Sequence, residues 1–144
     1  AAAKAFLLYR GINDVYLVAV GDQKYALRVW RRGGREIDMD AVSYEVEFLD
    51  FLRGRDFPVS APVRARDGSL YFKVDSPEGT RALALYEWAP GKKFGECLDE
   101  GTAARIGEVF ARLHLLGIEY QGSRPHDMAQ VVGFRSNVPA LLSF

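Results

Sequence analysis

The sequence has 144 residues, 49% of them apolar and 26% charged, so it can build a hydrophobic core and is not a disordered chain. Its 19 basic and 19 acidic residues give a formal net charge of +0, which disfavours a dedicated nucleic-acid-binding protein. Because Cys97 is the single cysteine and no apolar run is long enough for a membrane span, we expect a reduced, cytoplasmic protein without membrane partners.

Three strands and a helix are predicted in the first part of the chain. Phe6–Arg10 and Val15–Val20 are rich in β-forming residues, and Gly21-Asp22 turns the chain into a third strand over Lys24–Trp30. From Met39 to Arg53 the apolar residues recur with the period of a helix. A hairpin of strands followed by one helix is therefore expected.

The second part of the chain predicts further strands and a second helix. Pro62–Ala65 and Ser69–Val74 flank Asp67-Gly68, which is a strong hairpin signal. Arg81–Trp88 has the pattern of a largely buried strand, and Thr102–Leu116 has apolar residues along one helical face. Short turns between neighbouring strands predict an α+β fold: an antiparallel five-stranded sheet with one packed helix, followed by a connector and a second helix.

Two charged residues lie on otherwise apolar elements. Arg28 interrupts the strand Tyr25–Val29, and Glu45 lies in the apolar stripe of the first helix. Each residue has a simpler alternative: an edge-strand arginine whose head group reaches solvent, and a glutamate at the rim of the stripe. Pairing Arg28 with Glu45 would satisfy both charges and hold the guanidinium towards an anionic ligand such as a phosphate.

The same two residues resemble a pair found in kinases. Tyr25–Arg28 is similar to the kinase Val-Ala-Ile-Lys strand, with Arg28 in the place of the lysine, and Glu45 followed by Leu49 is similar to the helix that supplies the kinase glutamate. A guanidinium can bridge phosphate oxygens with its planar fork, but it is not equivalent to the point charge of a lysine.

Three further segments narrow the resemblance to one family. Gly11–Tyr16 resembles the nucleotide-positioning loop, Leu85–Gly91 the hinge, and Ala111–His114 the following helix of the aminoglycoside phosphotransferase family. This family has a kinase-like fold and includes choline, homoserine and bacterial stress-response kinases. The resemblance covers nearly the whole chain and implies an N-terminal lobe over residues 1–88, then a hinge, a helix and the start of a C-terminal lobe over residues 89–144.

The resemblance implies that the cofactor is ATP and that the nucleotide is the main partner. Arg28 would contact the phosphates, Glu45 would hold Arg28, and the loop with Gly11 and Asn13 would cover the nucleotide. Taken alone, Gly11 and Asn13 are also consistent with an ordinary β-turn.

The hinge would bind adenine through its backbone. The groups implied by the resemblance are the carbonyl of Glu87 and the amide of Ala89. The same segment also fits a plain connector between a strand and a helix, because its side chains carry no distinctive chemistry.

The family's catalytic and metal-binding residues find no match in this sequence. The family has a His-Gly-Asp loop with a nearby asparagine, followed by Asp-x-Asp, and these residues orient the acceptor hydroxyl and hold Mg²⁺. His126-Asp127 lacks the intervening glycine, and Val132 stands at the asparagine position. We therefore expect the chain alone to be inactive, with no catalytic or metal-binding residue, and Mg²⁺ only in the complete enzyme.

A lobe without its partner lobe exposes apolar surface, so either the missing C-terminal lobe or self-association is expected to cover it.

The alternative function is a non-enzymatic interaction module or a degenerate kinase-like module that uses the sheet and helix for docking. The phosphate acceptor stays open between an antibiotic, choline, homoserine and a protein hydroxyl. A long turn over Asp75–Thr80 favours the stress-response or homoserine kinase branch.

Overall fold

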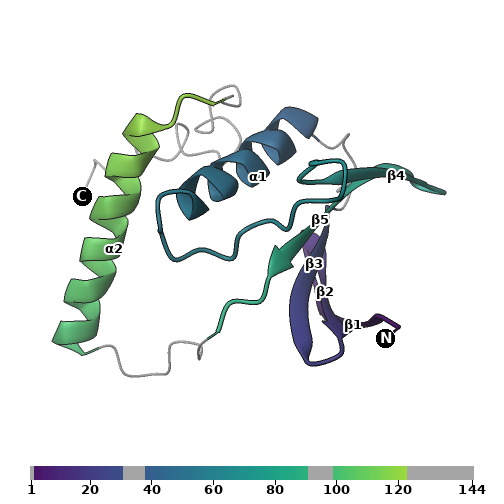
Figure 1. Ribbon diagram of the computed structural model, residues 1–144, viewed down its shortest axis with the longest axis horizontal. Helices are drawn as coiled ribbons and strands as arrows, with labels where there is room; N and C mark the ends of the chain where they lie inside the picture. The colour runs from purple at the N-terminus through teal and green to yellow at the C-terminus, as the bar shows by residue number, and fades with distance from the viewer. Residues whose placement is uncertain (1, 31–37, 91–98, 123–144) are drawn as a thin grey trace, which may run out of the picture.

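The computed structural model describes residues 2–30, 38–90 and 99–122 (Figure 1). The described helices and strands are, in chain order, β1 (Lys4–Arg10), β2 (Asn13–Val20), β3 (Gln23–Trp30), α1 (Met39–Arg53), β4 (Phe72–Ser76), β5 (Gly79–Glu87) and α2 (Glu100–Glu119). The strands form one antiparallel sheet in the order β1-β2-β3-β5-β4. The predicted α+β fold with a five-stranded sheet is confirmed, and Figure 1 shows α1 lying between the sheet and α2.

Helix α1 begins and ends where its sequence predicts. The Asp38 side chain caps its start by accepting hydrogen bonds from the backbone N–H groups of Asp40 at 3.0 Å and Ala41 at 3.1 Å. Gly54 follows the last turn, and its N–H donates to the carbonyl of Asp50. The hydrogen bonds at both ends are made to residues within or next to the helix. The contacts that orient α1 on the sheet therefore come from its buried face.

The buried face of α1 packs against the inner face of the sheet. Val42 and Val46 are 2% and 1% exposed and form one cluster with Trp30 and with the inward side chains of β5. Those inward side chains are Ala82, Ala84 and Tyr86, which alternate along the strand as the pleat requires. The two alanines leave room for the helix backbone to approach the sheet closely, next to Arg28.

Helix α2 packs on α1 rather than on the sheet. Leu116 of α2 joins Leu52 and Phe57 in a second buried cluster. The Tyr120 ring, just after α2, meets the Phe48 and Phe51 rings edge-on, with centroids 5.1 and 5.3 Å apart. None of the described helices is long and apolar enough to cross a membrane.

The apolar face predicted for α2 is divided in the structure. Its C-terminal part, with Leu113 and Leu116, packs against α1, as does the neighbouring segment around Phe57. Its middle part is exposed: Val109 and Phe110 have 46% and 55% of their surface accessible. The helix is also longer than predicted, running beyond the expected range of residues 102–116 at both ends.

The predicted hairpin around Asp67-Gly68 is wrong. The turn exists, because Gly68 has φ +87° and the Ala65 N–H donates to the Ser69 carbonyl at 2.9 Å. Its two flanks do not form a strand pair: Pro62 makes only an isolated bridge to Tyr86. The segment instead runs beside the end of β5, where the Val63 N–H donates to the Leu85 carbonyl at 2.7 Å.

Strand β5 pairs with β3 on one side and with β4 on the other, and a tight turn joins β4 to β5. Asp75 pairs with Thr80 and Ser76 pairs with Gly79, so only Pro77 and Glu78 lie outside the ladder. The expected long turn over Asp75–Thr80 is therefore wrong, and this segment does not favour the stress-response or homoserine kinase branch. Gly79, with φ +110°, permits this reversal.

Candidate functional site

Arg28 and Glu45 form an ion pair between β3 and α1. Arg28 Nη1 contacts Glu45 Oε1, and each side chain is 32% exposed. Strand β3 lies in the middle of the sheet, so the alternative of an edge-strand arginine is excluded. Glu45 faces the sheet from the apolar stripe of α1, as the helical period predicted. The predicted pairing is confirmed as a contact.

Asn13 and Trp30 fix the rest of the Arg28 guanidinium. In the amide orientation that satisfies its hydrogen bonds, the Asn13 side-chain oxygen accepts from Arg28 Nη2 at 2.7 Å and from Nε at 3.0 Å. The guanidinium carbon lies 4.7 Å from the centroid of the Trp30 ring. These contacts use one N–H on each guanidinium nitrogen, so the second N–H of Nη1 and of Nη2 can serve an anion.

Tyr86 is a site residue that the sequence did not single out. Its hydroxyl donates to Glu45 Oε1 at 3.4 Å from the adjacent strand β5. Burial and the neighbouring Glu45 charge raise the pKa of Tyr86 well above its usual value, so the hydroxyl keeps its proton. Burial also raises the pKa of Glu45 above 4.5, opposed by Arg28 and by the Tyr86 hydrogen bond.

The raised pKa of Glu45 predicts a pH dependence of folding. Ionised Glu45 is disfavoured in the folded state, so its contribution to stability is full below about pH 4.5 and is lost as the pH rises through the folded-state pKa. The free energy of unfolding of the parent, minus that of Glu45→Gln, should therefore be larger at pH 4 than at pH 7. Urea denaturation of both proteins at the two pH values measures this difference.

An exposed glutamate provides the control for the pH measurement. Glu108 lies on the exposed part of α2, so Glu108→Gln reports the general effect of removing a carboxylate. The difference in free energy of unfolding between the parent and Glu45→Gln is compared with the same difference for Glu108→Gln. If the Glu45 difference became smaller at pH 4 than at pH 7 relative to this control, the attraction of Glu45 to Arg28 would outweigh the effect of burial on its pKa.

A cleft opens beside the ion pair between β2, β3, β5 and α1. It consists of two adjoining hollows of about 300 and 250 Å³, which share Val15 and Arg28. The larger is lined by Val15, Ala26, Arg28, Glu45, Leu49, Val59, Ser60 and Tyr86, and the smaller by Tyr9, Ile12, Asn13, Val15 and Arg28. Arg28 therefore lies where a mainly apolar hollow meets the hollow beside the β1–β2 turn. Val59 and Ser60 had no local sequence signal, because they belong to an irregular segment.

The predicted loop forms a tight connection between β1 and β2. Gly11 and Ile12 are the only residues between the two strands, and the Gly11 N–H donates to the Asn13 carbonyl at 3.2 Å. A Cβ atom on Gly11 would lie 2.5 to 2.7 Å from the Tyr9 ring, which would have to move. Asn13, expected in the loop, is the first residue of β2. Together these residues bring Asn13 to Arg28.

The predicted hinge residues lie at the exposed end of β5. Glu87 is the last residue of the strand, and Ala89 follows it on the surface. The Glu87 carbonyl accepts a hydrogen bond from the Ser60 hydroxyl at 2.5 Å. A carbonyl oxygen has two lone pairs, so this contact leaves acceptor capacity for a second donor.

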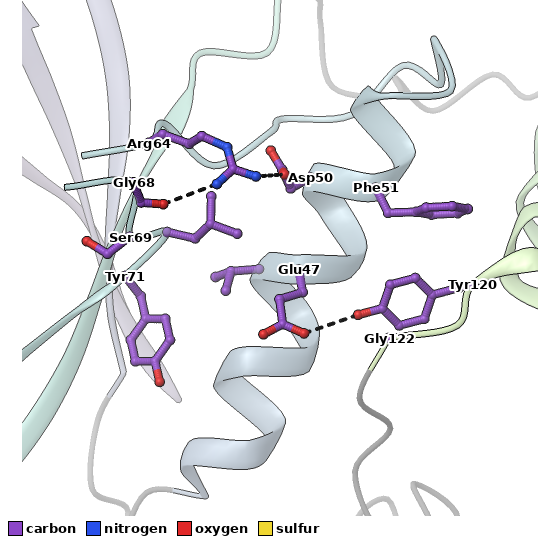
Figure 2. Close-up of a pocket in the computed structure, with 11 residues that line it drawn as sticks. Glu47, Asp50, Phe51, Arg64, Gly68, Ser69, Tyr71, Tyr120 and Gly122 are labelled. Carbon is purple, nitrogen blue, oxygen red and sulfur yellow. Dashed lines mark hydrogen bonds and ion pairs between the residues drawn. The ribbon is translucent and has the colours of Figure 1, made fainter. Parts of the chain in front are cut away.

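Another face of α1 borders a larger cavity of about 540 Å³. Figure 2 shows Glu47 held by the Tyr120 hydroxyl, while Asp50 binds Arg64, which precedes the Asp67-Gly68 turn. Neither Arg28 nor Glu45 lines this cavity. Glu47 thus points away from the ion pair.

Metal ligands are not gathered in the described ranges. Within residues 2–30, 38–90 and 99–122, no three His, Cys, Asp or Glu side chains are placed to hold one metal ion. His126-Asp127, Val132 and Cys97 fall outside the described residues.

The five-stranded antiparallel sheet with its packed helix and the Arg28–Glu45 ion pair agree with the expectations from the sequence. A sequence profile of the phosphotransferase enzyme family matches residues 10–138. The chain belongs to the phosphotransferase enzyme family. The match includes the Gly11–Asn13 turn, the ion pair, the end of β5 and α2.

Relatives of this phosphotransferase-family chain are longer than it is. The uncharacterized protein sll1119 of Synechocystis sp. is 38% identical over 106 residues, which make up 74% of this chain and 29% of the relative. A homoserine kinase of Caulobacter vibrioides is 30% identical over 86% of this chain and 38% of its own length. The chain thus spans well under half of these relatives.

Two solved structures share the fold. An amicoumacin kinase in complex with AMP-PNP, Ca²⁺ and Ami matches with a TM-score of 0.70 and 24% identity, over 84% of this chain and 36% of that one. A microcompartment-associated aminopropanol kinase matches with a TM-score of 0.59 and 30% identity, over 85% of this chain and 37% of that one. The kinase-like fold expected from the sequence is confirmed.

Proposed function

We propose that this chain is the ATP-binding part of a phosphotransferase that transfers the γ-phosphoryl group of ATP to a hydroxyl. The observation that carries the proposal is the Arg28–Glu45 ion pair with Asn13 on its other side, at the junction of the two hollows. A held guanidinium with spare N–H donors is suited to phosphate oxygens.

The two hollows suit different parts of a nucleotide, the base and the phosphates. The larger one has apolar walls from Val15, Ala26 and Val59, which suit the flat face of a base. The smaller one lies beside Asn13 and Arg28, which suit phosphates. At the end of β5, the carbonyl of Glu87 and the amide of Ala89 are the proposed partners of the adenine edge.

We assign residues 1–88 to an N-terminal lobe and residues 89–144 to the hinge, α2 and the start of a C-terminal lobe. The exposed side chains Val109 and Phe110 on α2 support this division, because the remainder of a longer protein can cover them. Mg²⁺ would be held by that remainder. The relatives named for homoserine, amicoumacin and aminopropanol kinases differ in acceptor, so the proposal specifies only a hydroxyl.

Titration of the chain with ATP tests the proposal. We expect saturable binding that is tighter for ATP than for adenosine, because the phosphates add charged contacts. Calorimetry with ATP, adenosine and GTP measures the order of affinities. Absence of ATP binding at millimolar concentration would overturn the proposal and favour the alternative of a non-enzymatic docking module.

The DNA sequence downstream of the Phe144 codon gives a second, independent check. A downstream His-Gly-Asp loop followed by Asp-x-Asp would support a complete phosphotransferase. A stop codon at that point would instead favour the interaction module.

A further inference from the structure

A buried aspartate lies directly behind the Gly11–Asn13 loop. Asp14 is the second residue of β2 and is only 6% exposed. Its neighbours Asn13 and Val15 both border the cleft that holds Arg28. Because side chains alternate along a strand, Asp14 points to the opposite, outer face of the sheet. A carboxylate buried to this extent needs opposite charge nearby.

Two arginines supply that charge: Arg10 from the neighbouring strand β1, and Arg81 from β5, which lies beyond β3. Arg10 Nε lies 3.6 Å from Asp14 Oδ1, and Arg81 Nη1 lies 3.9 Å from Asp14 Oδ2. Arg81 also forms an ion pair with Glu78 in the β4–β5 turn. Alternating charges therefore run across the outer face of the sheet from the end of β1, over β2, to β5 and its turn.

This charge chain holds the Gly11–Asn13 loop by its two ends. Arg10 is the last residue of β1 and immediately precedes the loop, while Asp14 immediately follows it. The Ile12 side chain at the loop tip does not pack against the sheet, because Ile12 is 89% exposed. The Arg10–Asp14 contact thus closes the base of the loop, and Arg81 links that base to β5 on the far side of β3.

We propose that Asp14 is a positioning residue for the nucleotide phosphates, an inference that rests on the proposed function. Asp14 does not touch the nucleotide; it fixes the loop from behind, so that Asn13 stays on Arg28. Without the charge chain, nucleotide binding would have to order the loop. Ordering about one residue of backbone corresponds to roughly a fivefold to thirtyfold loss of affinity.

The test compares ATP and adenosine binding in Asp14→Asn. We expect the affinity for ATP to fall by about fivefold to thirtyfold and the affinity for adenosine to stay within about twofold, because only the phosphates use the loop. The matched control is Asp50→Asn. Asp50 is also an aspartate between two arginines, Arg53 and Arg64, but it lies on α1 outside the cleft. This control should leave the ratio of ATP to adenosine affinity unchanged.

Hydrogen exchange provides a readout that needs no nucleotide. The amide of Gly11, which donates to Asn13, should exchange faster in Asp14→Asn than in the parent, while amides of α1 should not change. If Asp14→Asn does not fold, Arg10→Ala serves instead, because the Arg10 side chain is 64% exposed and should be replaceable without unfolding. It should shift the affinity ratio in the same direction.

The outcomes separate the two proposals. A parent that binds no ATP overturns the proposed function and this inference with it. A parent that binds ATP, with an unchanged affinity ratio and unchanged Gly11 exchange in Asp14→Asn, overturns only the role of Asp14. Equal losses for ATP and adenosine would show a general loss of stability and would also reject positioning.

Discussion

Replacement of Arg28 by alanine is expected to weaken ATP binding by about tenfold to hundredfold. A hydrogen bond to a charged group contributes about 1.5–3 kcal/mol, and each 1.4 kcal/mol is about a factor of ten in affinity. Arg28 is the cation at the junction of the two hollows, and its remaining N–H groups are the proposed phosphate donors. Calorimetric titration of the parent and of Arg28→Ala with ATP measures the effect.

Three variants make the Arg28 result interpretable. Arg28→Met keeps an apolar stem on the strand and separates the loss of charge from the loss of packing. Arg28→Lys keeps the charge without the planar fork and should retain more affinity than Arg28→Ala. Arg66→Ala removes an exposed arginine from a turn that does not line the cleft, and should bind ATP like the parent. Equal ATP affinity of the parent and Arg28→Ala would exclude a phosphate role for Arg28.

The Arg28–Glu45 contact could be predicted because both residues follow local periods on adjacent elements. The strand period of two places Arg28 on the face of Ala26 and Trp30, and the helical period places Glu45 between Val42 and Leu49. A helix that follows a strand and covers its sheet must bring these faces together. The contact therefore follows from two local patterns and one packing rule.

The remaining cleft residues could not be predicted in this way. Tyr86 contacts Glu45 of α1 from β5, and Ser60, in the irregular segment after α1, donates to the carbonyl of Glu87. Neither contact has a periodic signal, because each depends on where a distant segment lies. The alternation of Ala82, Ala84 and Tyr86 predicts only that Tyr86 lies on the buried face of β5, and it does not identify Glu45 as its partner.

The hairpin error at Asp67-Gly68 has a similar cause. The turn chemistry is local and was correctly predicted, but the choice of strand partner depends on tertiary packing. Leu70 and Tyr71 pack against the cluster beneath α1 instead of extending a hairpin, so β4 begins only at Phe72. Pro62 has no N–H to donate, which further weakens a ladder along its segment.

Replacement of Leu52 by alanine is expected to lower the free energy of unfolding by about 2–5 kcal/mol. Leu52 is 2% exposed and joins α1 to Phe57 and to Leu116 of α2. Removing its side chain leaves a cavity between the two helices that neighbouring side chains fill only in part. Since α1 also carries Glu45, a loosened helix should reduce ATP affinity as a secondary effect. Urea denaturation measures the change in stability.

The matched control for Leu52 is Leu115→Ala, which makes the same chemical change on the exposed face of α2. Leu115 is 63% exposed, so this variant should stay within about 0.5 kcal/mol of the parent. Both variants replace one leucine by alanine, so their composition and chain length are the same. A difference between their free energies of unfolding therefore reports the buried contact of α1 with α2. If Leu52→Ala were no more destabilising than Leu115→Ala, α2 would not pack on α1, and the second cluster would contribute nothing to holding Glu45 against Arg28.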